Sequence, residues 1–473
     1  MSKREAPQTR QKRTKHVTVG TPREASLRAV TAQKKLDASQ RPAATVELII
    51  ENVRCFAGRH EIPIRPLTVL VGENSSGKST LLAALSIISD NRFPLNPEFN
   101  QPPYSLGNFQ TIATCKSGKH PGATKFSIGF KSGSDAFPND VDAVPRHVVA
   151  TYALNQRTTG LSELRAARTD GTVTLRLLPS EEKYEINVVA APTSDRRSER
   201  FHVPAVSGLE REPDLSQMYL SQFSGISATD FLRAMNLGAA LNGLSLTSSV
   251  SIAPIRTKPK RTYDEAAEDY SPEGSHIPFV LARILSGGAD SKAKRALLTG
   301  LRRFGEESGL FKDIEIRNLG DRPGDPFQVI VTAVGASTNL LDVGYGVSQA
   351  LPLVVQSILA ADENILLLQQ PEVHLHPKAQ AALGSFFVDM HSQSGKHFVV
   401  ETHSDYIVDR IRMEIADGKL SSDAFLILYL ERHDTETTIY PITVDSLGNL
   451  IGVPSTYRAF FLREAVNLLS RGE

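Results

Sequence analysis

The chain has 473 residues, of which 40% are hydrophobic and 22% are charged, a composition that is ordinary for a globular protein and long enough for two or three lobes. Its two cysteines cannot form a disulfide framework, and no apolar run approaches the roughly 18 residues of a membrane span or forms an N-terminal signal segment. We therefore expect a cytoplasmic protein without a membrane segment.

The formal charge of +1 is unevenly distributed along the chain. Residues 1–45 hold 11 Lys and Arg against 3 Asp and Glu, which gives this segment +8 and leaves −7 for the remainder. Because the segment has few large apolar residues, burial cannot offset the entropy lost on ordering it. It is predicted to be a disordered basic tail. Three roles for this tail are open: it keeps the protein in solution, it binds nucleic acid or an acidic partner, or it acts as a transit peptide.

The first predicted elements of the folded part form the N-terminal half of an α/β core, residues 46–107. Apolar alternation over 46–64 predicts a β-hairpin. The continuous apolar run LTVLVG, residues 67–72, is typical of a strand that is buried on both faces. Helical spacing of apolar residues follows over 78–89.

Residues 108–310 are predicted to be an insertion that divides this core. Short β-like runs alternate with turn clusters from 108 to 205, which predicts an antiparallel lobe. From about 215 the pattern becomes helical, and a charged loop rich in Pro and Gly interrupts it at 256–277. The basic stretch RTKPKR, residues 256–261, is interpreted as a solvated loop or as a contact for DNA, RNA or phosphates.

Residues 311–473 are predicted to be the C-terminal half of the core. After two strands, DIEIRNL and FQVIVTAV, the pattern predicts a helix at 347–360, a strand at 365–369, a helix at 377–391, a strand at 397–402 and a helix at 405–415. The strand-like runs FLILYLE and TIYPITV and one more helix follow. Alternation of strand and helix is the pattern of a parallel sheet.

The segment GENSSGKST, residues 72–80, matches the phosphate-binding pattern G-x-x-x-x-G-K-[ST] and joins a buried strand to a helix, as that pattern requires. Two glycines allow a tight loop whose backbone N–H groups, with the helix N-terminus, bind phosphate oxygens. Lys78 is expected to reach the β- and γ-phosphates, and the Ser79 hydroxyl is expected to bind Mg²⁺. The predicted nucleotide ligands in this loop are Gly72, Asn74, Ser75, Gly77, Lys78, Ser79 and Thr80.

A second candidate for phosphate contact is the stretch DVGYGVSQALPLVV, in which Gly344 and Gly346 precede a predicted helix. With Ser348 and Gln349, these glycines form an anion-facing helix start or, alternatively, a tight turn before a capped helix. Another glycine pair, in ILSGGAD at 284–290, is interpreted as a helix stop.

Four motifs occur together in the order and spacing of a known group of proteins: LVGENSSGKSTLLAAL, DVGYGVSQALPLV, LLLQQPEVHLHPKAQAALG and FVVETHSDYIVDRIR. Over most of residues 46–470 the chain resembles the AAA-type, ABC-like P-loop ATPases related to the SMC, RecF and OLD families. The resemblance implies an α/β fold, an ABC-type P-loop NTPase whose mixed core sheet is split by an inserted β-rich and helical lobe. It also implies ATP and Mg²⁺ as cofactors, and a homodimer or higher homo-oligomer in which Gly346, Ser348 and Gln349 of one subunit face the ATP of the other.

Many members of the resembled group act in antiphage defence or DNA repair beside a separate effector. The resemblance therefore implies that ATP-dependent closure of a dimer controls a partner protein, such as a nuclease or toxin, or acts on DNA or RNA. The OLD nuclease domain is not expected, since only about 60 residues follow THSDYIVDRIR and they contain no cluster of acids suited to metal-dependent cleavage. The alternatives are a non-hydrolysing ATP-bound scaffold and a RecF-like DNA repair ATPase.

The strand predicted at 365–369 runs into the sequence QQPE, where the resembled ATPases end the strand in an acid. In those proteins the first acid supports Mg²⁺ through water and the second polarises the attacking water. An amide can hydrogen-bond a metal-bound water, but it cannot act as a base. Three readings remain open: Glu372 takes the acidic role, the site binds ATP tightly and hydrolyses it very slowly, or an acid has been changed to glutamine to trap ATP.

His403, in ETHSD, occupies the switch-histidine position of the resembled ATPases, where an imidazole hydrogen-bonds the γ-phosphate; otherwise it is a histidine at a strand end. Gln110, in LGNFQTI, is a candidate sensor of Mg²⁺ and water, or an ordinary strand glutamine. The candidate catalytic residues are thus Glu372, His403, Gln369 and Gln370, and the candidate Mg²⁺ ligands are Ser79, Gln110 and Gln369.

Overall fold

The structure of the chain is a computed structural model that describes residues 46–457 apart from 91, 95–96, 115–121, 133–146, 156–157, 168–170, 179–182, 191–197, 205–247, 265–268, 287–291, 323, 334 and 363. The predictions for the basic tail, for helices between 215 and 247, for Gly287 and Gly288 and for the last helix after residue 457 lie outside the described residues. Within the described residues, no helix combines the length and the apolar character needed to cross a membrane.

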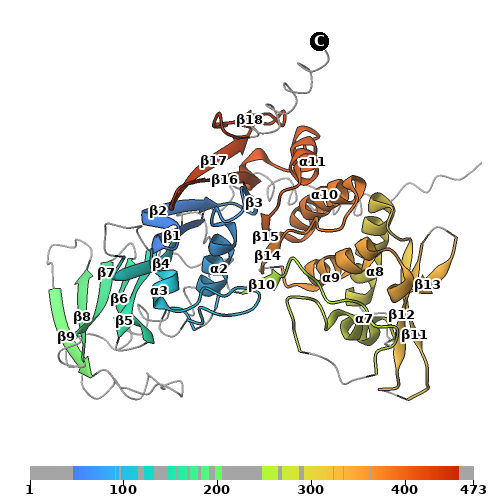
Figure 1. The fold of residues 1–473 in the computed structure, drawn as a ribbon, viewed down its shortest axis with the longest axis horizontal. Helices are drawn as coiled ribbons and strands as arrows, with labels where there is room; N and C mark the ends of the chain where they lie inside the picture. Colours follow the sequence, from blue (N-terminus) through green and yellow to red (C-terminus); the bar gives the residue numbers. More distant parts are fainter. Residues whose placement is uncertain are drawn as a thin grey trace, which may run out of the picture. The chain divides into compact units, whose positions relative to one another are not determined.

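The core is a sheet of seven strands in the order β10-β14-β15-β3-β16-β17-β18 (Figure 1). The first five strands in this order, β10, β14, β15, β3 and β16, are parallel to one another. Strand β17 pairs antiparallel with β16, and β18 pairs antiparallel with β17. This mixed sheet and its helices confirm the predicted α/β fold class. The strands are β3 (Leu67–Gly72), β10 (Ser249–Ile252), β14 (Ile365–Gln369), β15 (His397–Glu401), β16 (Phe425–His433), β17 (Glu436–Val444) and β18 (Leu450–Ile451).

Hydrophobic clusters cover both faces of this sheet, because successive side chains of a strand point to opposite faces. Leu367 of β14 belongs to the cluster that contains α2 (Lys78–Ile88), whereas Leu366 belongs to the cluster on the other face. Burial on both faces explains why the central strands are continuous apolar runs in the sequence. The second cluster contains residues of α7 (Ile277–Leu285), α8 (Lys292–Ser308), α9 (Tyr345–Leu359), α10 (Pro377–Ser394) and α11 (Asp405–Ala416).

A second sheet has eight antiparallel strands in the order β2-β1-β4-β5-β6-β7-β8-β9 and shares the α2 cluster with the core. Strand β4 pairs with β1, so this sheet begins in the predicted N-terminal hairpin and continues into residues assigned to the insertion. The predicted antiparallel pairing is confirmed in its described strands, while the division of the chain at 107 and 310 stays a prediction. The strands are β1 (Val46–Val53), β2 (Phe56–Ile64), β4 (Lys125–Ser132), β5 (His147–Asn155), β6 (Thr158–Ala167), β7 (Gly171–Leu178), β8 (Lys183–Ala190) and β9 (Ser198–Pro204).

Two smaller features complete the described fold. A short helix, α3 (Phe109–Ile112), lies in the chain between α2 and β4. The strands β11 (Asp313–Asn318), β12 (Phe327–Thr332) and β13 (Ser337–Asn339) form an antiparallel sheet, and residues of β11 and β12 enter the second cluster.

The helical character predicted from residue 215 to 310 is wrong at β10. Its four residues form a strand parallel to β14, with Val250 opposite Leu366. A strand this short, in which serines alternate with apolar residues, gives too weak a pattern to stand out beside helical segments. The basic loop that follows is not solvated throughout, since Arg256 is only 2% exposed, although Lys258 and Lys260 are exposed.

Lys396 stabilises the end of α9 from the turn between α10 and β15. Its buried amine donates hydrogen bonds to the carbonyl oxygens of Ser357 at 2.8 Å and Ile358 at 2.7 Å. These carbonyls belong to the last turn of the helix, where a cation also opposes the negative end of the helix dipole.

Substitution Lys396→Met keeps the apolar length of the side chain and removes the charged donor. We expect it to lower the free energy of unfolding by about 1.5–3 kcal/mol, the usual contribution of hydrogen bonds to a charged group. Urea unfolding followed by circular dichroism measures the change, with the exposed Lys312→Met as the matched control. Equal midpoints for the two variants would contradict the role given to Lys396.

Candidate functional site

The carboxyl ends of three neighbouring parallel strands meet at one edge of the core sheet. Strand β15 lies between β14 and β3, so that Glu401 is level with Gln369 on one side and with Leu70 on the other. Strand β3 runs directly into the GENSSGKST loop. Because ligands of open α/β sheets bind outside the carboxyl ends of the strands, this edge is the candidate site.

The GENSSGKST loop has the backbone shape that its glycines allow. Gly77 has a φ of 100°, a conformation that L side chains rarely adopt. A Cβ atom at this position would lie 2.6 Å from the Phe56 ring and 2.7 Å from the Cys55 sulfur. The glycine therefore permits both the turn and the close packing of the loop against the N-terminal hairpin.

Lys78 places a positive charge inside this loop. Its Nζ donates to the carbonyl oxygens of Gly72 at 2.9 Å and Glu73 at 2.7 Å, and the residue is 4% exposed. Burial lowers the pKa of the amine, while the negative charges of Glu401 and Glu372 act to raise it. An ammonium group held among backbone dipoles is suited to bind a phosphate.

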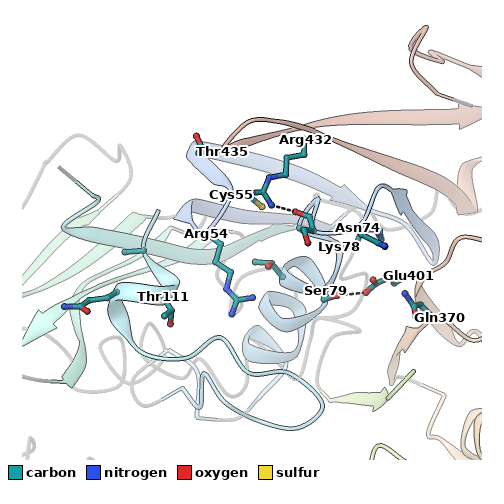
Figure 2. Close-up of a pocket in the computed structure, with 15 residues that line it drawn as sticks. Arg54, Cys55, Asn74, Lys78, Ser79, Thr111, Gln370, Glu401, Arg432 and Thr435 are labelled. Carbon is teal, nitrogen blue, oxygen red and sulfur yellow. Dashed lines mark hydrogen bonds between the residues drawn. The ribbon is translucent and has the colours of Figure 1, made fainter. Parts of the chain in front are cut away.

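A cavity of about 780 Å³ opens beside the loop, which is within the usual range for small-molecule sites (Figure 2). Eight of the predicted site residues line it: Asn74, Ser75, Gly77, Lys78, Ser79, Thr80, Gln110 and Gln370. The structure thus brings Gln110, on α3, to the same cavity as the loop, although the two are distant in sequence. Gly72 contributes its carbonyl to Lys78 instead of lining the cavity.

Glu401 also lines the cavity, and it was not among the site residues predicted from the sequence. The Ser79 hydroxyl donates a hydrogen bond to its Oε2 at 2.8 Å, as Figure 2 shows. The carboxylate is 5% exposed at the last position of β15. The only signal in the sequence was an acid at the end of an apolar strand, and it becomes meaningful once β15 is known to lie next to β3.

Two arginines at the cavity were also missed by the sequence reading. Arg432, on β16, donates from Nη1 to the carbonyl oxygen of Ser75 at 2.8 Å. Arg54, in the turn of the N-terminal hairpin, donates to the carbonyl oxygens of Ser105 and Leu106, and burial lowers the pKa of its guanidinium. Both side chains add positive charge to a cavity suited to an anion (Figure 2). Neither position belongs to a local motif.

Within the QQPE segment, Gln370 lines the cavity and Glu372 does not. Gln369 is 9% exposed at the end of β14, and Gln370, with a φ of 42°, lines the cavity. Glu372 lies beyond the residues that line it, where its Oε1 accepts a hydrogen bond from the backbone N–H of His403 at 2.7 Å. The catalytic roles of these residues stay predictions.

The negative charge of Glu372 acts on two nearby basic groups, the Arg256 guanidinium and the His403 imidazole. Burial lowers the pKa of Arg256 to about 10, and the charge of Glu372 opposes this shift. Partial desolvation and the charge of Lys78 lower the pKa of the exposed His403, so its imidazole is neutral near pH 7. A neutral imidazole can donate one hydrogen bond to a phosphate, as its predicted role requires.

The second predicted phosphate contact lies at the start of α9 and away from this cavity. Gly344 and Tyr345 are exposed there, and Gly346 packs closely against the carbonyl of His374. Ser348 is buried and donates to the carbonyl of Tyr345 at 2.8 Å. A contact between this helix start and nucleotide would therefore have to come from a second copy of the chain.

Gln349 is also buried, at 0% exposed, and its amide has no hydrogen-bond partner among the described residues. In the described part of the chain, no group of three or more His, Cys, Asp and Glu is arranged to hold a metal ion.

The family described as the AAA ATPase domain matches residues 46–135 and 234–408 of this chain. No curated protein matches it. Among solved structures, an SMC head bound to the C-winged helix domain of ScpA is similar at 11% identity over 84% of this chain and 98% of the other, with a TM-score of 0.44. The SMC head domain from Thermotoga maritima is 12% identical over 85% and 99%, with a TM-score of 0.36. The Smc head domain from Pyrococcus furiosus, with an extended coiled coil and bound to the C-terminal domain of ScpA, is 12% identical over 90% and 98%, with a TM-score of 0.40.

Substitution Lys78→Ala removes the only ammonium that lies inside the described loop. We expect a loss of about 3 kcal/mol in ATP binding, which is roughly 100-fold in Kd, because charged hydrogen bonds to the phosphates are lost. Isothermal titration calorimetry with ATP measures the effect, and the exposed Lys378→Ala on α10 serves as the control. An unchanged Kd in a folded Lys78→Ala protein would show that the loop is not the phosphate site.

Proposed function

Because this chain belongs to the AAA ATPase domain family, we propose that it binds ATP with Mg²⁺, hydrolyses the nucleotide slowly, and pairs with a second copy when ATP is bound. The observation that carries this proposal is the Lys78 ammonium held inside the GENSSGKST loop, beside a cavity large enough for a nucleotide. The two arginines at the cavity add charge that favours a polyphosphate.

The residues of the cavity fit a magnesium ion that is shared with the nucleotide. Ser79 offers a hydroxyl oxygen, and Mg²⁺ is usually bound by one or two protein oxygens together with water and substrate phosphates. The ion, when bound, neutralises charge on the β- and γ-phosphates. Gln110 lines the same cavity and keeps its proposed role as a sensor of the ion and its water.

In this proposal Gln370 orients the attacking water without removing its proton. Its amide oxygen can accept a hydrogen bond from water, and the residue lines the cavity. Phosphoryl transfer passes through a loose transition state, in which positioning and charge stabilisation contribute most of the catalysis. A site with an amide at this position is therefore expected to turn ATP over slowly.

ATP-dependent pairing is proposed to use the exposed start of α9. The first N–H groups of a helix have no partner within the helix, so they are suited to bind the γ-phosphate held by a second copy. Since Ser348 and Gln349 are buried, the backbone of the Gly344–Gly346 turn makes this contact in the proposal. Closure follows because the phosphate contacts exist only in the paired state.

The partner of this ATPase is proposed from the resemblance of its sequence motifs to those of the ABC-like P-loop ATPases. Related ATPases act beside a nuclease or toxin in antiphage defence, and we extend that role to this chain. A RecF-like role on DNA is the alternative, and it would require salt-sensitive DNA binding. One observation, the pair of amides at 369 and 370, favours a non-hydrolysing scaffold. A protein of this kind would retain intact ATP through purification.

Substitution Gln370→Glu adds a carboxylate that can act as a base beside the attacking water. Phosphate release from ATP is expected to rise roughly 100-fold, the lower end of the usual contribution of a general base. The exposed Gln393→Glu on α10 is the control and should leave the rate unchanged. If neither the parent nor Gln370→Glu releases phosphate, the proposal that this chain hydrolyses ATP is wrong, and the alternative of a non-hydrolysing scaffold is correct.

Substitution Tyr345→Asp tests pairing. Tyr345 is 41% exposed at the start of α9, and an aspartate there would repel the γ-phosphate of a partner copy without disturbing the helix. With ATP and Mg²⁺, light scattering should show the parent and the control Tyr406→Asp as dimers and Tyr345→Asp as a monomer that still binds ATP. Tyr406 is 53% exposed on α11. Dimers of all three proteins would rule out this interface.

A further inference from the structure

The amides of Gln369, the last residue of β14, and of Gln370, which follows it, would leave a bound magnesium ion without a carboxylate from that strand. Gln369 is 9% exposed at the last position of β14. Its amide can accept a hydrogen bond from a metal-bound water, but it carries no negative charge to balance the ion. Any carboxylate that supports the ion must therefore come from another element.

The sheet places one carboxylate level with this position. In the parallel pair of β14 and β15, Gln369 and Glu401 are register partners, and the backbone N–H of Gln370 donates to the carbonyl of Glu401 at 2.8 Å. Neighbouring strands lie about 4.8 Å apart. Since β15 lies between β14 and β3, Glu401 is one strand closer to the phosphate loop than Gln369 is.

The contact made by Glu401 points to the same ion. Its Oε2 accepts the hydrogen bond of Ser79, the serine predicted to bind Mg²⁺ (Figure 2). Two hard oxygen donors, a hydroxyl and a carboxylate, thus meet at the mouth of the loop. This is the donor type that Mg²⁺ prefers, with phosphates and water completing its shell.

Glu401 has no direct ion-pair partner in the described part of the chain. The residue is 5% exposed, and no lysine, arginine or histidine among the described residues forms an ion pair with it. Lys78 acts on it by Coulomb attraction, but its Nζ donates to the carbonyls of Gly72 and Glu73. One neutral hydroxyl is weak compensation for a buried carboxylate. A cation at this place would supply the missing charge.

We propose that Glu401 supports the magnesium ion of bound ATP in place of an acid at 369, so that this role lies on β15 instead of β14. This inference rests on the proposed function, because it concerns the ion that accompanies ATP. It separates two tasks: Glu401 balances the charge of the ion, and Gln370 orients the water. Glu372, outside the cavity, is then not needed at the metal.

The test uses Mn²⁺ in place of Mg²⁺ and measures its affinity for the ATP complex of the full chain by electron paramagnetic resonance. Glu401→Gln keeps the size of the side chain and its acceptor for Ser79, and it removes only the charge. We expect Mn²⁺ affinity to fall about 10- to 100-fold, as for other residues that support a metal through its ligands. ATP affinity in EDTA should not weaken, and Glu372→Gln should leave Mn²⁺ affinity unchanged.

The double variant Gln369→Glu with Glu401→Gln moves the carboxylate back to β14 and keeps one charge at the strand ends. It should recover most of the lost Mn²⁺ affinity, and it keeps the proposal testable if Glu401→Gln alone folds poorly. Unchanged Mn²⁺ affinity in Glu401→Gln, no recovery in the double variant, or a loss in Glu372→Gln would overturn the inference while ATP binding remains. Absence of ATP binding by the parent chain in the presence of Mg²⁺ would overturn the proposed function as well.

Discussion

The parallel alignment of β14, β15 and β3 is the constraint on which the site depends. It brings three strand ends to one edge, so that residues from distant parts of the sequence meet beside the phosphate loop. The strands are held in this order by apolar side chains on both faces, with Leu367 in one cluster and Leu366 in the other. The chemistry at the edge therefore depends on the register of these strands, since a shift by one residue would exchange the faces and remove the match between Gln369 and Glu401.

The phosphate loop is held from outside as well as by its own glycines. Cys55 and Phe56 of the N-terminal hairpin pack against Gly77, and Arg432 holds the carbonyl of Ser75. These contacts come from segments that lie far apart in the sequence, before and after the loop. The loop is thereby fixed before nucleotide arrives, and such preorganisation lowers the cost of binding.

The sequence predicted those features that depend on local pattern. The GENSSGKST loop, the strand at 365–369 and the α/β class follow from residue types within short windows, and the structure has them. Glu401, Arg54 and Arg432 could not be predicted in this way, because their meaning comes from strand order and loop packing. The same holds for β10, whose four residues become a strand only because β14 offers an edge to pair with.

The hairpin that touches the loop is also the first part of the eight-stranded sheet, since β4 pairs with β1 and the pairing continues to β9. Seven spacings of about 4.8 Å give this sheet a span of roughly 34 Å. Because the hairpin end of this sheet packs against the phosphate loop, a rotation of the sheet about the loop would displace the far strand most. A tilt of about 10° at the loop would move the outermost strand by about 6 Å, which is more than one strand spacing.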